Sequence, residues 1–530
     1  MQVRRTLIYA GFFLLLCLSP VAFSPPPCVA QEGGRVIEGG VISRSVTFEG
    51  EVVVTADLYV PPGVTVRFAE GAVVRFKKSE STKVEPENFL PGTEITIRGN
   101  VVSEGARFLF EGDGGLVVDG GSLTLAKSVV SGGTYGVLLL SGKLRAEGSE
   151  IRNCETGLLV AGTPGKDTDL SGKSLLVTGC KTGAIVPEGY DTGGMIDVRA
   201  PTEYGVLTFE SHFDEEGGFV PDPVDDLKKG FSPGEVIEDL FIEKDRELQG
   251  DVLIKGVVRV APGAHLSIKA GSRIFFEFSD SNGDGIGESG LFLQGTLVVS
   301  GTEAEPVVFA SRRGSKKGLW DSINFMASDL ETNRIENAVI LESFRGLHSH
   351  FSDVYVKNVR IYRTFRGLQF QESKFVVEGL GIFDSVSALR CRDSDVTISG
   401  MYTAGNVAGG NFLRVRGTVR DVFFSDSVLY GIRFRESDIE MEKARVTGGL
   451  YSLSLQEGVL RFRGVSQADS LFAGFQAQRS EVTIDDSKFQ QNKIYGFSLR
   501  GGRYVLKNVT ISGSGVEKIN VEENPEIIIK

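Results

Sequence analysis

Residues 367–387 read GLQFQESKFVVEGLGIFDSVS, and residues 388–408, which follow directly, read ALRCRDSDVTISGMYTAGNVA with the same pattern. In each copy, apolar side chains alternate with polar ones in three short runs. The apolar positions of the first copy are Leu368 and Phe370, then Phe375 and Val377, then Leu380 and Ile382. An alternation of period two is typical of a β-strand that buries one face. Each copy therefore predicts three short strands.

The repeat continues to the end of the chain at a nearly constant interval. Its anchor positions are Gly346, Gly367, Ala388, Gly409, Gly431, Ser452, Gly474, Gly496 and Lys518. Pairs such as Glu372-Ser373 and Asp384-Ser385 separate the runs, and these residue types favour turns. Three strands and three turns close one coil, and coils bury their apolar side chains only by stacking. The sequence thus predicts an all-β parallel β-helix. A leucine-rich repeat, the nearest alternative, has one strand per repeat and a Leu-Asn signature that is absent here.

The N-terminal half carries a weaker form of the repeat, in which Gly115, Gly136 and Gly157 are evenly spaced at the same interval. The next anchor, Gly183, comes later than this interval requires. The longer gap predicts a loop inserted at residues 162–172.

The two halves also begin alike. Residues 50–76 align without gaps on residues 250–276, with identical Gly, Val, Pro and Phe positions. This internal duplication predicts two β-helix units, at residues 31–200 and 248–530. Residues 201–247 between them are acidic and contain proline, and we interpret them as a linker or small subdomain that caps the first unit.

Residues 1–30 are typical of an export signal. Arg4 and Arg5 make a positive start, Leu7 to Leu18 form an apolar core too short to cross a bilayer, and Ala30 ends a small-residue cleavage site. We expect an exported protein that is periplasmic, at the cell surface or extracellular. No later stretch is apolar enough to be an integral membrane segment of the mature chain.

Composition narrows the range of partners. The net charge of −12 argues against a nucleic-acid partner, and the 67 glycines are close to double the usual share. Of the five cysteines, Cys154, Cys180 and Cys391 remain after signal removal. Cys154 and Cys180 occupy the same place ahead of their anchor glycines, so they should stack on successive coils. That spacing suits a disulfide, and two stacked thiols are the alternative.

Three segments show a resemblance to a known family. Val260-Ala-Pro-Gly263, Leu297-Val-Val-Ser-Gly-Thr302 and Trp320-Asp-Ser-Ile-Asn-Phe325 resemble the entry to the pectate-lyase-like right-handed β-helix superfamily, in its secreted bacterial β-helix-repeat branch. The resemblance implies a right-handed parallel β-helix with three short strands per coil of about 21–22 residues. It leaves the function open, because the superfamily mixes lyases, hydrolases, epimerases, binding proteins and adhesins.

No catalytic residues can be assigned from the sequence. The Gly-His-Gly and Arg-Ile-Lys segments of polygalacturonase-like members are missing, as is the Asp-Pro-His of epimerase-like members, and the register places Asp485-Asp486 at a turn. Active sites on β-helices combine neighbouring coils and have no local motif, so an enzyme stays open. Three classes remain: a non-catalytic exported scaffold that binds a polysaccharide or cell-envelope component, a carbohydrate-active lyase, hydrolase or epimerase, and an assembly factor or structural part of a surface complex.

Polar residues alternate along the outward face of the first strand of each coil. The strip that we expect to bind a ligand contains His348, His350, Gln369, Gln371, Arg390, Arg392, Arg433 and Arg435. Stacked Arg and Gln side chains could follow an extended anionic glycan, because each guanidinium offers two donors to a carboxylate or sulfate. The alternative is a solvated face whose cations pair with Glu372, Asp393 and Glu436 at the next turn.

A second candidate site lies in a polar insertion near residue 280. Asp280, Asn282 and Asp284 occupy alternate positions, Gly285 follows, and Ile286 and Glu288 add a carbonyl and a carboxylate. This arrangement predicts a structural Ca²⁺ loop similar to those of dockerins and thrombospondin type-3 repeats rather than a complete EF-hand. A polar turn without metal is the alternative.

Overall fold

The computed structural model describes residues 35–78, 92–161, 168–187, 189–190, 194–209, 224–425 and 427–530. The predicted export signal, most of the first polar insertion and part of the loop at 162–172 lie outside these residues.

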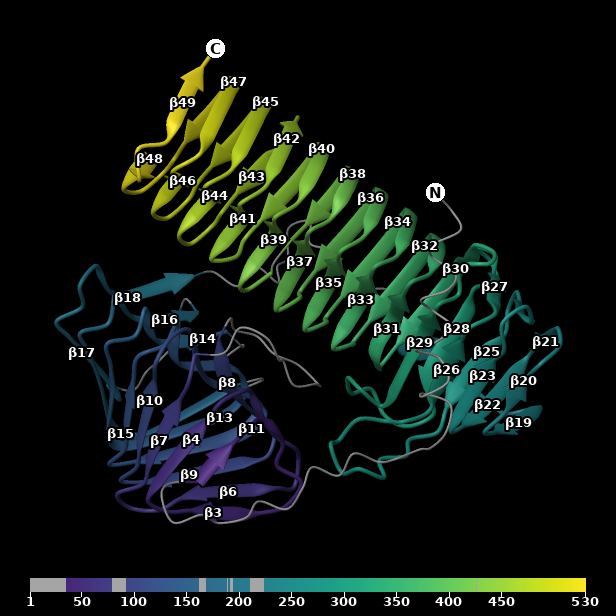
Figure 1. Cartoon of the computed structure of the whole chain (residues 1–530), viewed down its shortest axis with the longest axis horizontal. Helices are drawn as coiled ribbons and strands as arrows, with labels where there is room; N and C mark the ends of the chain where they lie inside the picture. The colour runs from purple at the N-terminus through teal and green to yellow at the C-terminus, as the bar shows by residue number, and fades with distance from the viewer. Residues whose placement is uncertain are drawn as a thin grey trace, which may run out of the picture.

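The C-terminal unit is a stack of parallel strands in two sheets (Figure 1). The first sheet contains β20 (Phe241–Ile242), β23 (Val257–Val260), β26 (Gly290–Leu293), β29 (Trp320–Met326), β31 (Ser343–His350), β33 (Arg366–Gln371), β35 (Ser387–Arg392), β37 (Ala408–Leu413), β39 (Tyr430–Arg435), β41 (Tyr451–Gln456), β44 (Ala473–Gln478), β46 (Tyr495–Arg500) and β48 (Glu517–Glu522). We call it the ligand-face sheet, because its strands carry the predicted ligand strip.

The second sheet of this unit contains β19 (Glu235–Glu238), β21 (Arg246–Leu248), β22 (Asp251–Lys255), β24 (His265–Lys269), β25 (Arg273–Phe276), β27 (Thr296–Ser300), β28 (Val307–Ser311), β30 (Asn333–Leu341), β32 (Asp353–Tyr362), β34 (Lys374–Phe383), β36 (Asp395–Ala404), β38 (Arg416–Phe424), β40 (Asp438–Thr447), β42 (Val459–Arg463), β43 (Ser466–Ala468), β45 (Glu481–Gln490), β47 (Arg503–Ser512) and β49 (Glu526–Ile529).

Equivalent residues of successive coils pair as the repeat predicts. Leu347 pairs with Leu368 and Leu368 with Leu389, and all three are fully buried. The right-handed parallel β-helix predicted from the sequence is confirmed. One detail differs, because in the regular coils the second and third runs join into a single strand, as in β32, β34 and β36. A single residue with positive φ bends each strand, for example Asn358 (φ 50°) or Gly379 (φ 79°).

Corners between strands are stabilised by ladders of serine. Glu372 adopts a positive φ of 51°, and Ser373 follows it. The Ser373 hydroxyl accepts a hydrogen bond from the Ser352 amide (3.3 Å) and donates one to the Gln371 carbonyl (2.9 Å). The Ser373 amide in turn donates to the Ser394 hydroxyl (3.1 Å). Each serine therefore satisfies backbone groups that the turn takes out of the sheet.

The N-terminal unit is one parallel sheet wound into coils. It contains β1 (Arg35–Ile37), β2 (Gly40–Val41), β3 (Val46–Phe48), β4 (Glu51–Val54), β5 (Leu58–Val60), β6 (Thr65–Phe68), β7 (Val73–Phe76), β8 (Thr93–Ile97), β9 (Asn100–Glu104), β10 (Arg107–Phe110), β11 (Gly114–Ala126), β12 (Val129–Ser131), β13 (Tyr135–Arg152), β14 (Thr156–Val160), β15 (Thr168–Thr178), β16 (Thr182–Pro187), β17 (Ile196–Arg199) and β18 (Tyr204–Phe209). Strands β4–β7 match β22–β25 in the order and spacing that the duplication predicts.

Residues 201–247 contain strands at both ends. β18 pairs with β16 of the first unit, and β19 pairs with β22 of the second. Between them, the 3-10 helix η2 (Val224–Lys228) packs on the second unit, where Val224 lies in a cluster with Leu253 and Phe275. The described part of this segment is thus largely built into the two units.

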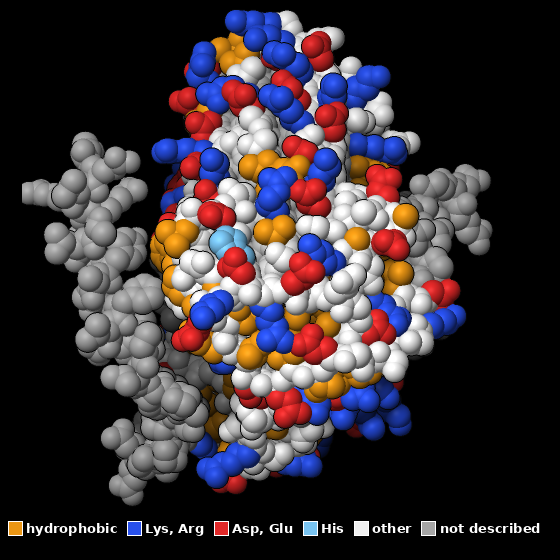
Figure 2. All heavy atoms as spheres, turned by 90° about the vertical axis from the view of Figure 1, so that its right-hand side faces the viewer, with side chains coloured by type: hydrophobic (Ala, Val, Ile, Leu, Met, Phe, Trp, Pro, Cys, Tyr) orange, Lys and Arg blue, Asp and Glu red, His pale blue; other side chains and the backbone are white. Residues whose placement is uncertain are grey.

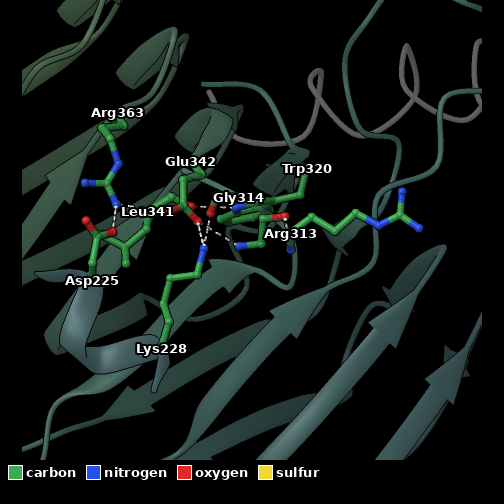
Figure 3. A network of polar contacts seen from close by, with 9 residues as sticks. Asp225, Lys228, Arg313, Gly314, Trp320, Leu341, Glu342 and Arg363 are labelled. Atoms are coloured by element: carbon green, nitrogen blue, oxygen red, sulfur yellow. Dashed lines mark hydrogen bonds and ion pairs between the residues drawn. The ribbon is translucent and has the colours of Figure 1, made fainter. Parts of the chain in front are cut away.

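A buried ion network anchors η2 (Figure 3). Glu342 is fully buried and pairs with Lys228 (2.8 Å) and Arg363 (3.0 Å). Arg363 also contacts Asp225 (2.6 Å). The Lys228 ammonium donates to the Gly314 carbonyl (2.5 Å), so the network connects η2 to three segments of the second unit.

Candidate functional site

The predicted ligand strip lies on the outward face of the ligand-face sheet. Along β35, Leu389 and Cys391 point into the core. Arg390 and Arg392, which alternate with them, are more exposed. The strip forms two columns of paired residues: Asn324, His348, Gln369, Arg390, Asn411 and Arg433, and beside them His350, Gln371, Arg392, Leu413 and Arg435. Asn411 and Leu413 belong to the irregular coil near Gly409, and the sequence pattern missed them.

At one end of the strip, His348 is buried in positive surroundings. Its Nε2 lies 2.9 Å from His350 Nε2 and 3.3 Å from Gln369 Nε2. Because the Gln369 amide nitrogen donates, His348 Nε2 accepts and Nδ1 carries the proton; this buried Nδ1 has no hydrogen-bond partner among the described residues. Burial, with Arg345, His350 and Arg366 nearby, lowers the pKa of His348 to about 2. This histidine is therefore neutral at physiological pH.

Further along, Arg433 and Arg435 project from β39. Burial, followed by the neighbouring Arg433, lowers the pKa of Arg435 to about 10. Arg392 pairs with Asp393 (2.8 Å), as the alternative reading of the strip expects. Among the described residues, no carboxylate lies within ion-pair distance of Arg433 or Arg435. The strip is thus only partly neutralised by the acids at its turns.

The first unit packs against this sheet and forms a wall beside the strip. Leu138 and Leu159 on its outward face cluster with Leu429, Leu450 and Leu471, which precede strands of the ligand-face sheet. Figure 1 shows the two units side by side.

Contacts of the two units recur along their length. Arg98 lies over the Phe365 ring (3.6 Å), and the rings of Tyr204 and Phe472 are 6.4 Å apart. Between these points lie Tyr135 of the first unit and Tyr451 of the second. The charges of Glu155 and Arg433 influence the pKa of both tyrosines, and burial raises the pKa of Tyr451 to about 12.

The sequence reasoning missed this wall, although a signal was present. In Val137-Leu138-Leu139 and Leu158-Leu159-Val160, the outward positions are apolar too. A strand buried on both faces reads as a continuous apolar run, so these runs predict a covered sheet.

The candidate calcium loop is a tight turn at the boundary between the units. The Asp280 carboxylate accepts backbone hydrogen bonds from Gly283 (2.8 Å), Asp284 (3.0 Å) and Gly285 (2.9 Å). Asn282 and Glu288 complete the loop, since the Asn282 oxygen accepts from the Asp284 amide (2.9 Å) and Glu288 accepts from the Ser281 amide (2.9 Å).

Asp284 also accepts a hydrogen bond across the unit boundary, because its carbonyl faces the Tyr59 hydroxyl (2.8 Å). Burial raises the pKa of the Asp284 carboxyl. Ile286 is buried, and its amide donates to the Asp284 carboxylate (2.8 Å). In the described part of the chain, no three His, Cys, Asp or Glu side chains are arranged to hold a metal ion. Calcium binding by this loop stays a prediction.

Cys154 and Cys180 stack on successive coils as expected and are free thiols in the structure, as is Cys391. The Cys154 thiol donates to the Gly132 carbonyl (3.1 Å). The neighbouring Cys154 side chain lowers the pKa of the Cys180 thiol, while burial raises the pKa of Cys391 to about 12. The geometry is that of a stacked thiol pair, and disulfide formation stays a prediction.

The acid pair Asp485-Asp486 sits at a bend. Asp486 has a φ of 49° and accepts a hydrogen bond from the Asn508 amide (2.8 Å), and Asp485 pairs with Lys507 (3.6 Å). These roles are structural.

Comparison with solved structures returns carbohydrate-active β-helix proteins. A double mutant of the periplasmic alginate epimerase AlgG matches with 12% identity and a TM-score of 0.35, covering 56% of this chain and 79% of the epimerase. The catalytic domain of a GH87 alpha-1,3-glucanase in complex with nigerose matches with 10% identity and a TM-score of 0.30, covering 51% and 63%. No family model and no curated protein matches the chain.

By its own strand pairing, the chain is a parallel β-helix protein, so the fold that the resemblance implies is confirmed. Among the described residues, no helix is long and apolar enough to cross a membrane.

Proposed function

We propose that this protein is an exported, non-catalytic β-helix scaffold that binds a polysaccharide along the ligand strip. The observation that carries the proposal is the continuity of polar side chains in register on one sheet. Asn324, His348, Gln369, Arg390, Asn411 and Arg433 follow one another on adjacent strands, about 4.8 Å apart. A row of donors and acceptors at this spacing suits an extended polymer better than a compact ligand.

The wall formed by the first unit supports the same conclusion. Its contacts with Phe365, Tyr451 and Phe472 extend from β33 to β44 of the ligand-face sheet. The strip is therefore bordered over several coils, and a polymer lying along it would contact both units. The signal-like composition of residues 1–30 supports export.

Binding and cleavage are separated by one experiment. The mature protein is tested for retention on a panel of neutral and acidic polysaccharides, and the same mixtures are assayed for new reducing ends and for unsaturated products. We expect retention of at least one polysaccharide without product. Product formation would replace the proposal by a carbohydrate-active enzyme, and absence of retention on the whole panel would reject polysaccharide binding.

A further inference from the structure

The two arginines of β39 have no acidic partner among the described residues, whereas several arginines of the neighbouring strands and turns do. Arg414 pairs with Asp393 (2.5 Å), Arg420 with Glu442 (3.4 Å) and Arg461 with Asp438 (3.0 Å). Arg433 and Arg435 form no such pair with the described residues, and the buried Nε of Arg435 has no hydrogen-bond partner. The face shown in Figure 2, by contrast, has basic and acidic side chains interspersed.

A second orphaned atom lies beside this pair. Asn411 pairs with Arg433 across the neighbouring strand β37, and its side-chain oxygen is buried without a partner. Buried polar atoms are normally hydrogen-bonded, so the unpartnered Asn411 oxygen and Arg435 Nε on neighbouring strands call for an explanation. Two donors and one acceptor on one small patch match a ligand that has both an anionic group and a hydroxyl.

We infer that Asn411, Arg433 and Arg435 form a subsite for a carboxylate-bearing sugar of the bound polysaccharide, an inference that rests on the proposed function. The guanidinium of Arg433 or Arg435 donates two parallel hydrogen bonds to the carboxylate, and the second arginine adds charge. The Asn411 oxygen accepts a hydrogen bond from a hydroxyl of the same or the next sugar. The ligand is thus an acidic glycan, recognised on an otherwise acidic protein.

Position supports this assignment. Tyr135 of the first unit and Tyr451 of the second are partly buried against the same apolar cluster, and the charge of Arg433 influences the pKa of both, so the subsite lies near the border of the first unit with the ligand-face sheet. Burial, with Asp113 second, raises the pKa of Glu155 on that wall. Glu155 lies outside ion-pair distance of Arg433, since no such pair forms among the described residues. A carboxylate brought by the ligand can therefore take the place that no protein carboxylate fills.

The test uses the mature full chain and three probes: polygalacturonate, dextran sulfate and neutral dextran. Binding is measured by affinity electrophoresis for the parent, for Arg433→Ser with Arg435→Ser, and for the control Arg420→Ser with Arg461→Ser. The control also removes two positive charges, but from β38 and β42 of the second sheet of the same unit. We expect the parent to prefer polygalacturonate and the Arg433/Arg435 variant to bind it about 30-fold more weakly, because two charge-assisted hydrogen bonds are lost. The control should bind like the parent.

The outcomes distinguish the two proposals. If the parent binds none of the probes or any wider panel of polysaccharides, the proposed function fails. If it binds dextran as tightly as polygalacturonate, or if the two variants lose affinity equally, only the carboxylate subsite fails. Preference for dextran sulfate would also reject the carboxylate. Thermal melting of both variants checks folding, and Asn411→Ala, which keeps both charges, should weaken polygalacturonate binding several-fold without changing its salt dependence.

Discussion

Single residues with a left-handed backbone form corners in the regular coils of the second unit. Glu372, Asp393 and Glu436 all have φ near 50°, a conformation that costs energy for residues other than glycine. The serine that follows each of them recovers part of that cost, because its hydroxyl bonds the backbone of the preceding coil or turn. Ser373, Ser394 and Ser437 are accordingly buried. The pairs of an acidic residue and a serine in the sequence therefore mark corners at which the serine hydroxyl bonds the backbone.

The pKa values of two histidines are shifted in opposite directions. Hydrogen bonds to Asp245 (2.9 Å) and Glu331 (3.1 Å) raise the pKa of His265, whereas the pKa of His348 is lowered to about 2. We expect the imidazole NMR signal of His265 to titrate above pH 6.5 and that of His348 to stay unchanged down to about pH 4. His265→Gln and His348→Gln assign the signals.

The direction of the His265 shift also fixes its effect on stability. Its stabilising contribution is complete below about pH 6.5, the ordinary value for histidine, and is lost as the pH rises through the raised pKa. A His348 signal that moves between pH 5 and 7 would contradict the buried, positive environment of the strip.

Removal of the Glu342 charge should destabilise the second unit. Glu342→Gln leaves Lys228 and Arg363 without their buried carboxylate, and we expect the free energy of unfolding to fall by about 3 kcal/mol. Urea denaturation followed by circular dichroism measures the change. Asp226→Asn is the control, because it removes an exposed pair with Lys229 and should leave the denaturation midpoint unchanged. Equal effects of both variants would show that the network contributes little.

At the level of strands, the sequence predicts the stack well and its bends poorly. The constant period of the repeat and the alternation of apolar and polar side chains are enough to identify the coils, because only one register buries Leu368, Leu389 and their equivalents. Asp486 and Asn508 are turn formers in a sequence, yet here each bends a continuous strand. A strand bent at one left-handed residue and a turn between two strands favour the same residue types. The sequence pattern therefore could not distinguish a bent strand from two strands joined by a turn.

The candidate site shows the same division between regular and irregular parts. The strip could be predicted, since alternation fixes which side chains point outward. Asn411 could not, because glycines at 409 and 410 disturb the repeat there. Tyr135 and Tyr451 pack against the same apolar cluster although they belong to different halves of the chain, and no local sequence pattern predicts such an arrangement.

The loop at residues 280–288 offers a test of calcium binding. If Ca²⁺ binds, the oxygens of Asp280, Asn282 and Asp284 gain a cation that offsets their mutual repulsion, and the protein should melt at a higher temperature with Ca²⁺ than with chelator. The double variant Asp280→Ala, Asp284→Ala should lose that difference. Identical melting of the parent in both buffers would show that the loop is a turn held only by its own hydrogen bonds.

At the scale of the whole molecule, the two halves use equivalent strands for different purposes. The outward positions are apolar in the first unit, at Leu138, Leu159 and Ile185, and polar in the second, at Gln369, Arg390 and Arg433. The apolar set covers the leucines that precede the strands of the ligand-face sheet. One unit thus supplies an apolar packing face, and the other presents a polar strip.

This packing predicts that a charge placed in the cluster will separate the units. Leu450 is 5% exposed and lies in the cluster with Leu138 and Leu159. Leu450→Asp buries an unpaired carboxylate if the units stay together, at a cost of several kcal/mol, so separation is the less costly state. We expect a larger radius of gyration by small-angle scattering and a calorimetric transition that splits in two. Leu330→Asp, at a side chain that is 73% exposed, should change neither. Unchanged scattering of the Leu450 variant would mean that polar contacts such as Tyr59 with Asp284 are sufficient to hold the wall beside the strip.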